Sequence, residues 1–156
     1  MKLDPFTLRI ALDKKGSAKG ELYLDDGETF LHQEGQIVWR KFVAEKPERK
    51  DKILCVSSRD LAQEKPGEAV DGVALKSISS SNPFSKSLES VRVERLVIIG
   101  LTNKPKAVKV DGGKELEYVY DAGVAAAGKK EGEASVLVVK DPGVAVSKDW
   151  AILIEL

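Results

Sequence analysis

Apolar and polar residues alternate in short runs along most of this chain. In the segment FTLRIAL, residues 6–12, Leu8 and Ile10 fall on one side of an extended chain, and Thr7 and Arg9 fall on the other. A period of two is typical of a half-buried β-strand. A second extended run, GELYL, follows a charged connection that contains glycine. The sequence therefore predicts two strands joined by a hairpin turn.

Runs rich in β-branched and apolar residues recur through the rest of the chain. Clusters of Gly, Pro, Asn and Asp separate them, as turn chemistry requires. The strand around Trp39 carries bulky residues on both sides, so we expect it to be covered on both faces. These runs are QIVWRKFV, which contains Trp39, and KILCVSS, VALKSIS, VRVERLVIIG, KAVKV, LEYVY, SVLVVK and WAILIEL. About ten short strands with little helix predict an all-β fold, an antiparallel β-sandwich.

One region departs from this pattern. Between residues 43 and 89 the composition shifts toward Lys, Glu, Ser and Pro, with few apolar islands. Within it, DLAQE at 60–64 offers one helical turn that Pro66 and Gly67 would end. We expect residues 43–89 to form a polar, mobile insertion in a single domain that spans residues 1–156.

Composition narrows the classes of function. A chain of 156 residues is long enough for one domain with a sizeable core. Basic and acidic residues balance at 25 each, so no overall field draws the protein to nucleic acid or to an anionic membrane. No apolar run reaches the roughly 20 residues of a membrane span, and the opening residues do not resemble a signal peptide. Cys55 is the single cysteine, which excludes a disulfide within this chain.

The acidic segment Asp25-Asp26-Gly27-Glu28 is the most conspicuous candidate site. A calcium loop needs oxygen ligands at alternating positions across about a dozen residues, and this segment offers adjacent carboxylates instead. Glycoside hydrolysis needs two facing carboxyl groups, and the sequence identifies no second one. Asp side chains also bind nearby backbone amides, and glycine supplies a positive φ. These properties favour a structural turn at Asp25, Asp26 and Gly27.

The other chemistry-bearing residues give weaker signals. His32 is the only histidine, so a histidine-pair metal site is excluded, and the serines lack the elbow motif of a serine hydrolase. Cys55 lies in an apolar alternation and is expected to pack as a small hydrophobe. Trp39 or Trp150 could stack on a sugar, although Trp150 precedes an apolar strand and favours the core. We therefore predict no catalytic residue, no cofactor and no metal ligand in this chain.

Several stretches together resemble one enzyme family. They are MKLDPFTLRIALDKKGSAKGELYLDDGETF, IVWRKF, VRVERLVIIG and SVLVVKDPGVAVSKDWAILIEL, in that order. These stretches resemble the carboxyl-terminal end of α-glucosidases of glycoside hydrolase family 31, in particular the catalytic subunit of the heterodimeric enzyme of the endoplasmic reticulum. The resemblance covers nearly the whole chain apart from residues 43–89. ELYLDDGETF and PGVAVSKDW are its most specific parts.

The resemblance implies a role within a larger protein. Members of the family carry a catalytic (β/α)₈ barrel followed by a proximal and a distal β domain, and this chain is similar to the distal one. The catalytic aspartates of the family lie on the barrel, and no position here matches their motifs. The resemblance implies that the chain is a fragment of an enzyme that removes α-1,3-linked glucose from N-linked glycans in the endoplasmic reticulum lumen. Its implied partners are the remainder of the α-glucosidase chain and a non-catalytic β subunit, with the glycan bound elsewhere; a free-standing carbohydrate-binding module is the alternative.

Overall fold

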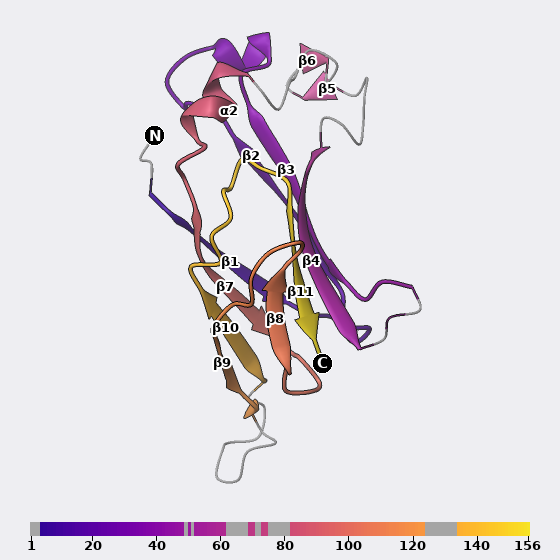
Figure 1. The fold of residues 1–156 in the computed structure, drawn as a ribbon. Helices are drawn as coiled ribbons and strands as arrows, with labels where there is room; N and C mark the ends of the chain where they lie inside the picture. Colours follow the sequence, from indigo (N-terminus) through magenta and orange to yellow (C-terminus); the bar gives the residue numbers. More distant parts are fainter. Residues whose placement is uncertain are drawn as a thin grey trace.

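The computed structural model describes residues 4–48, 50, 52–61, 69–70, 73–74, 82–123 and 134–156. Strands dominate it, and they form a four-stranded sheet and a five-stranded sheet that face each other (Figure 1). The strands are β1 (Phe6–Ala11), β2 (Ala18–Leu24), β3 (Val38–Glu45), β4 (Ile53–Asp60), β5 (Ala69–Val70), β6 (Val73–Ala74), β7 (Val93–Ile99), β8 (Ala107–Val110), β9 (Tyr118–Asp121), β10 (Val136–Lys140) and β11 (Trp150–Glu155). The prediction of an all-β sandwich with little helix is confirmed.

The order of strands is β1-β7-β10-β9 in one sheet and β2-β3-β4-β11-β8 in the other, with β5 and β6 paired separately. All pairs are antiparallel except β1 with β7, which run parallel, with Leu8 opposite Leu96. The expected antiparallel arrangement therefore fails at one pair. A parallel pair needs a long crossover between its strands, and here the crossover contains most of the second sheet.

The predicted hairpin between the first two strands is wrong. β1 and β2 belong to different sheets, so residues 12–17 carry the chain from one sheet to the other. A tight turn does form, because the Asp13 carboxylate accepts hydrogen bonds from the amides of Lys15 and Ser17 at 2.8 and 2.9 Å. In a hairpin the two apolar faces would lie side by side on one sheet. Here they face each other, and Leu8 and Ala18 both pack against the same core.

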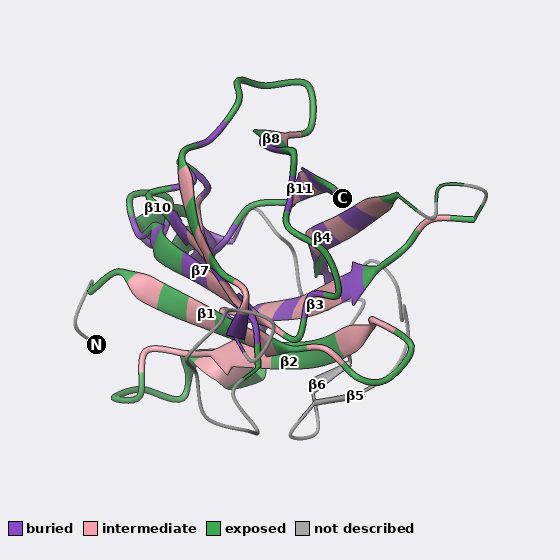
Figure 2. Cartoon of the chain, turned by 90° about the horizontal axis from the view of Figure 1, so that it is seen from below, coloured by how far each residue is buried: buried purple, intermediate pink, exposed green. Residues whose placement is uncertain are grey.

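The core lies between the two sheets. Its fully buried members come from central strands of both sheets, for example Val56 of β4, Leu96 of β7 and Ile152 of β11. In Figure 2 the buried residues concentrate on β3, β4, β7 and β10, whereas β1 and β2 at the sheet edges show intermediate and exposed residues. The strand around Trp39 has buried residues on one face and half-buried ones on the other, as expected for a strand covered on both sides.

Two short helical segments lie together at one end of the sandwich. These are the 3₁₀ helix η1 (Leu31–Glu34) and the α-helix α2 (Pro83–Ser87), both at the top of Figure 1. Asn82 caps α2 by accepting a hydrogen bond from the Ser85 amide at 2.7 Å. Asn-Pro at a helix start is a recognised signal, although the sequence pattern around it indicated only a turn.

The polar region 43–89 is described only in part. It contains β4, which lies in the middle of the five-stranded sheet, and α2. These two elements belong to the body of the fold. A helical turn was expected at 60–64. Asp60 is instead the last residue of β4, Leu61 is helical, and residues 62–64 lie outside the described residues. The insertion itself stays a prediction for the stretches that the structure does not describe.

Candidate functional site

The acidic turn after β2 is organised by its own side chains. Asp25 Oδ1 accepts a hydrogen bond from the Gly27 amide at 2.9 Å, and Gly27 has a φ of 65°. Asp26 Oδ1 accepts from the amides of Glu28 and Thr29 at 3.2 and 3.1 Å, and its Oδ2 accepts from the Thr29 hydroxyl. Both aspartates thus satisfy donors of the turn itself, which is the chemistry expected of a structural corner.

Electrostatics distinguishes this turn from an acid catalyst. The hydrogen bond from the Thr29 hydroxyl, followed by the bond from the Thr29 amide, holds the pKa of Asp26 below its ordinary value of 3.8. The general acid of a glycoside hydrolase needs the opposite, a raised pKa, so that it carries a proton at neutral pH. Asp26 is therefore a charged acceptor at neutral pH.

The other sequence candidates do not gather around this turn into a metal site. His32 lies on η1, and its Nδ1 is 3.4 Å from the carbonyl oxygen of Thr29. Across the described residues, no group of three or more His, Cys, Asp or Glu side chains is placed to hold a metal ion. In the same part of the chain, no helix is long and apolar enough to cross a membrane.

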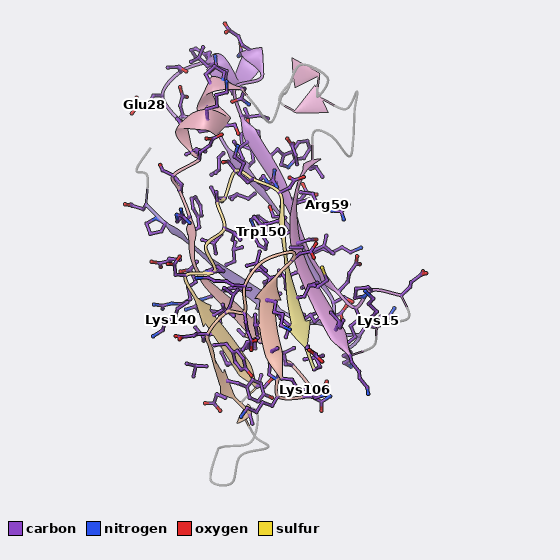
Figure 3. The ribbon with its side chains drawn as sticks, viewed as in Figure 1. Lys15, Glu28, Arg59, Lys106, Lys140 and Trp150 are labelled. Carbon is purple, nitrogen blue, oxygen red and sulfur yellow. The ribbon has the colours of Figure 1, made fainter. Side chains whose placement is uncertain are left out.

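Phe30 and Leu31 follow the turn and point away from the core. Their exposed fractions are 77% and 37%, and the structure shows one other exposed large hydrophobic among the described residues, Val119 on β9. A cavity of about 220 Å³ opens beside them and is lined by Asp26, Leu31, Gln36, Pro83 and Phe84. Figure 3 shows the same end of the molecule, where the labelled Glu28 projects outward.

A buried arginine cluster, which the sequence did not predict as a unit, lies between β3, β4 and the segment before β11. The Arg40 side chain is 2% exposed, and its Nη2 donates to Ser58 Oγ, Lys148 O and Asp149 Oδ1 at 3.0, 2.8 and 2.6 Å. Asp149 Oδ1 also accepts from the Asp60 amide at 3.1 Å. A charged residue on the apolar face of Val38 and Phe42 was the available signal, because a buried charge requires a partner.

The two tryptophans face opposite sides of the five-stranded sheet. Trp150 and Phe42 both lie opposite Ser58 in the strand register, so they share the inner face, and their rings are 6.0 Å apart. Trp39 lies three residues before Phe42 on β3, so its side chain is on the outer face of the sheet. Its Nε1 donates a hydrogen bond to Glu21 at 3.2 Å. In Figure 3 Trp150 lies between the sheets. The tryptophans therefore do not form one sugar-binding groove.

Cys55 lies on the outer face of β4. Its neighbours Leu54 and Val56 point into the core, while Cys55 is half-buried and free. Burial is the main cause that raises the pKa of the Cys55 thiol above its ordinary value of 9.0. The thiol is thus a weak nucleophile at neutral pH, but it packs on the outside of the sheet, and the sequence pattern alone did not show this.

Comparison with known proteins identifies relatives of this chain. No family model matches the chain. Neutral alpha-glucosidase AB of Homo sapiens is 34% identical over 157 residues, which cover 97% of this chain. A probable glucan 1,3-alpha-glucosidase of Oryza sativa is 30% identical over 152 residues, again over 97% of this chain. The chain is homologous to a segment of α-glucosidases. The resemblance found in the sequence is confirmed, but its expected gap is wrong, because the matched span includes residues 43–89.

A solved structure shows the same fold. A crystal structure of the ER glucosidase II heterodimer, made of the catalytic subunit and the binding domain of the regulatory subunit, superposes with a TM-score of 0.68 over 97% of this chain at 24% identity. The match covers 14% of that solved chain, and the human and rice relatives are matched over 13% and 14% of their length. The chain thus spans about one seventh of the proteins that it resembles.

Proposed function

We propose that the chain is a non-catalytic distal β domain of an endoplasmic reticulum α-glucosidase of the glucosidase II type. The intact enzyme hydrolyses α-1,3-linked glucose from N-linked glycans by a retaining mechanism. In this proposal the segment braces the catalytic barrel and the proximal carboxyl-terminal domain. The glycan binds on the barrel, outside this chain.

The proposal rests on how much of each protein the match covers. The match extends over 97% of this chain but over only 13% of the human relative. A segment of this size cannot hold the roughly 250 residues of a typical (β/α)₈ barrel. The lowered pKa of Asp26 is consistent with this proposal, because it leaves that carboxylate without a proton to donate at neutral pH.

The partners follow from the same relationship. The first partner is the remainder of the α-glucosidase polypeptide, which holds the catalytic residues. The second is the glucosidase II β subunit, since a solved relative is a complex of the catalytic subunit with a domain of its regulatory subunit. That complex is described as an ER enzyme, and we propose the endoplasmic reticulum lumen as the compartment of this chain.

The proposal is tested by separating the segment from the enzyme. The isolated 156-residue chain should not hydrolyse an α-1,3-linked glucose disaccharide. Deletion of the segment from the longer polypeptide should lower both the yield of folded enzyme and its hydrolytic activity. Hydrolysis by the isolated chain, or full activity and an unchanged Tm after the deletion, would overturn the proposal.

A further inference from the structure

One end of the sandwich carries apolar side chains that the described residues leave exposed or half-buried. It consists of Phe30, Leu31, Pro83 and Phe84, which we call the end patch. Phe30 is 77% exposed, although burial of a phenylalanine side chain is favourable. The cavity of about 220 Å³ between Leu31 and Phe84 makes the patch concave, so that it can receive a protruding side chain. Exposed apolar surface of this kind marks an interaction site more often than an accident of the fold.

The end patch is held in place by buried hydrogen bonds. The Asn82 side chain donates from Nδ2 to the Ile37 carbonyl at 2.8 Å and accepts from the Ser85 amide at 2.7 Å. It therefore fixes α2, which carries Phe84, to the segment that follows η1. On the other side, the Gly35 amide donates to the His32 carbonyl and closes η1. A surface that is ordered before it binds loses less entropy on association.

The polypeptide that precedes β1 leaves the fold at this same end. Phe6, the first residue of β1, packs against the small cluster of Val38, Leu88, Val91 and Val146, and Phe84 packs against the same cluster. In Figure 1 β1 begins toward the end of the sandwich that carries η1 and α2, while β11 ends toward the opposite end. In the enzyme of the proposed function, the domain that precedes this one therefore joins it beside the end patch.

We propose that the end patch is the surface on which the adjoining, preceding domain of the longer α-glucosidase polypeptide docks. The inference rests on the proposed function and adds the location of the contact. Phe30 inserts into that domain, and the cavity that Leu31, Pro83 and Phe84 help to line accepts a side chain in return. The acidic turn then has a second role besides reversing the chain after β2, because its hydrogen bonds orient the segment that carries the exposed Phe30.

A second opening competes as the docking surface. A cleft of about 350 Å³ lies between the edge strands β1 and β2, lined by residues that include Leu8, Ile10, Leu22 and Phe42. These apolar side chains are half-buried within the sandwich. None of the residues that line the cleft is an exposed large hydrophobic among the described residues, whereas Phe30 and Leu31 are. The end patch therefore carries two of the three exposed large hydrophobic side chains among the described residues, and the cleft carries none of them.

The test is hydroxyl-radical footprinting, read by mass spectrometry, of the isolated chain and of the longer polypeptide that contains it. Oxidation of Phe30 and Leu31 should be at least about tenfold slower in the longer polypeptide, because docking removes both side chains from water. Val119, which is 62% exposed on β9 at another part of the molecule, is the internal control and should be oxidised equally in both.

Matched variants of the longer polypeptide complete the test. Phe30→Ser should weaken docking and raise the oxidation of Phe84 at least about threefold, and Val119→Ser should leave it unchanged. Equal oxidation of Phe30 in both proteins overturns the inference. If the residues of the β1/β2 cleft are protected instead, the docking surface is elsewhere and the proposed function stands. If no residue of the segment is protected and its deletion leaves the enzyme active, the proposed function fails as well.

Discussion

Arg40 and Asp149 are 109 residues apart in the sequence and meet at 2.6 Å between Nη2 and Oδ1. The arginine is 2% exposed, whereas the aspartate side chain is 59% exposed. This bond ties β3 to the segment that enters β11. A buried guanidinium costs several kcal/mol to desolvate, so its partner is needed even though the partner itself reaches water.

Removal of this partner should destabilise the fold. Asp149→Ala should lower the free energy of unfolding by about 2 kcal/mol, less than the roughly 3–5 kcal/mol seen when a fully buried pair is broken, because Asp149 is exposed. Urea unfolding measures the change. Arg40→Met in the Asp149→Ala background removes the unpaired charge and should restore part of the loss. A double variant no more stable than Asp149→Ala would contradict this account.

Asn82→Ala should cost about 2 kcal/mol of unfolding free energy. The variant loses the cap of α2, worth about 1 kcal/mol, and leaves the Ile37 carbonyl without its 2.8 Å donor. Asn103→Ala, at an exposed position, is the matched control and should change stability by no more than about 0.5 kcal/mol. Equal effects of the two substitutions in thermal unfolding would show that the hydrogen bonds of Asn82 contribute nothing.

Asp26 should make stability depend on pH in the acidic range. Its pKa in the folded state lies below the ordinary value of 3.8, so the charged form favours folding above that pH. The contribution is lost as the pH falls through the folded-state pKa. Against Asp26→Asn, the wild type should show its largest advantage in Tm near neutral pH and lose that advantage in strong acid. Glu28→Gln controls for the loss of one charge, and an advantage that grew on acidification would refute the assignment.

Trp150 should contribute through its volume and not through its indole N–H. Among the described residues, Trp150 Nε1 is buried and has no hydrogen-bond partner. Trp150→Phe should therefore cost only about 1 kcal/mol, whereas Trp150→Ala should cost about 3 kcal/mol through the cavity beside Phe42. Trp39→Phe is the comparison, because it removes an indole N–H that does have a partner, Glu21. If Trp150→Phe were as damaging as Trp150→Ala, the N–H would have a partner after all.

The sequence predicted the strands well because a period of two is a local property. The alternation at Leu8 and Ile10 identified β1 without any knowledge of its partner. The same local signal could not distinguish a hairpin from a connection between two sheets, because both need a turn like the one that Asp13 closes. The parallel partner of β1 is also invisible locally, since Leu96 is far from Leu8 in the sequence.

In the candidate site, too, local features could be predicted from the sequence and long-range contacts could not. Asp25, Asp26 and Gly27 were predicted as a structural turn from residue chemistry. Asp25 and Asp26 accept hydrogen bonds from amides of this segment, and the structural role of the three residues stays a prediction. The exposure of Phe30 was not predictable, because a phenylalanine after a turn is ordinarily buried. The contact of Arg40 with Asp149 depends on the packing of distant segments, so the sequence offered only the indirect signal of a charge on an apolar face.

The position of β11 has a consequence for biosynthesis. β11 follows β4 and β8 in the sequence, yet it lies between them within the five-stranded sheet. During translation, β2, β3 and β4 must wait with an unpaired edge until β11 leaves the ribosome. A prematurely terminated chain therefore lacks an inner strand, and it exposes β4 to chaperones and proteases.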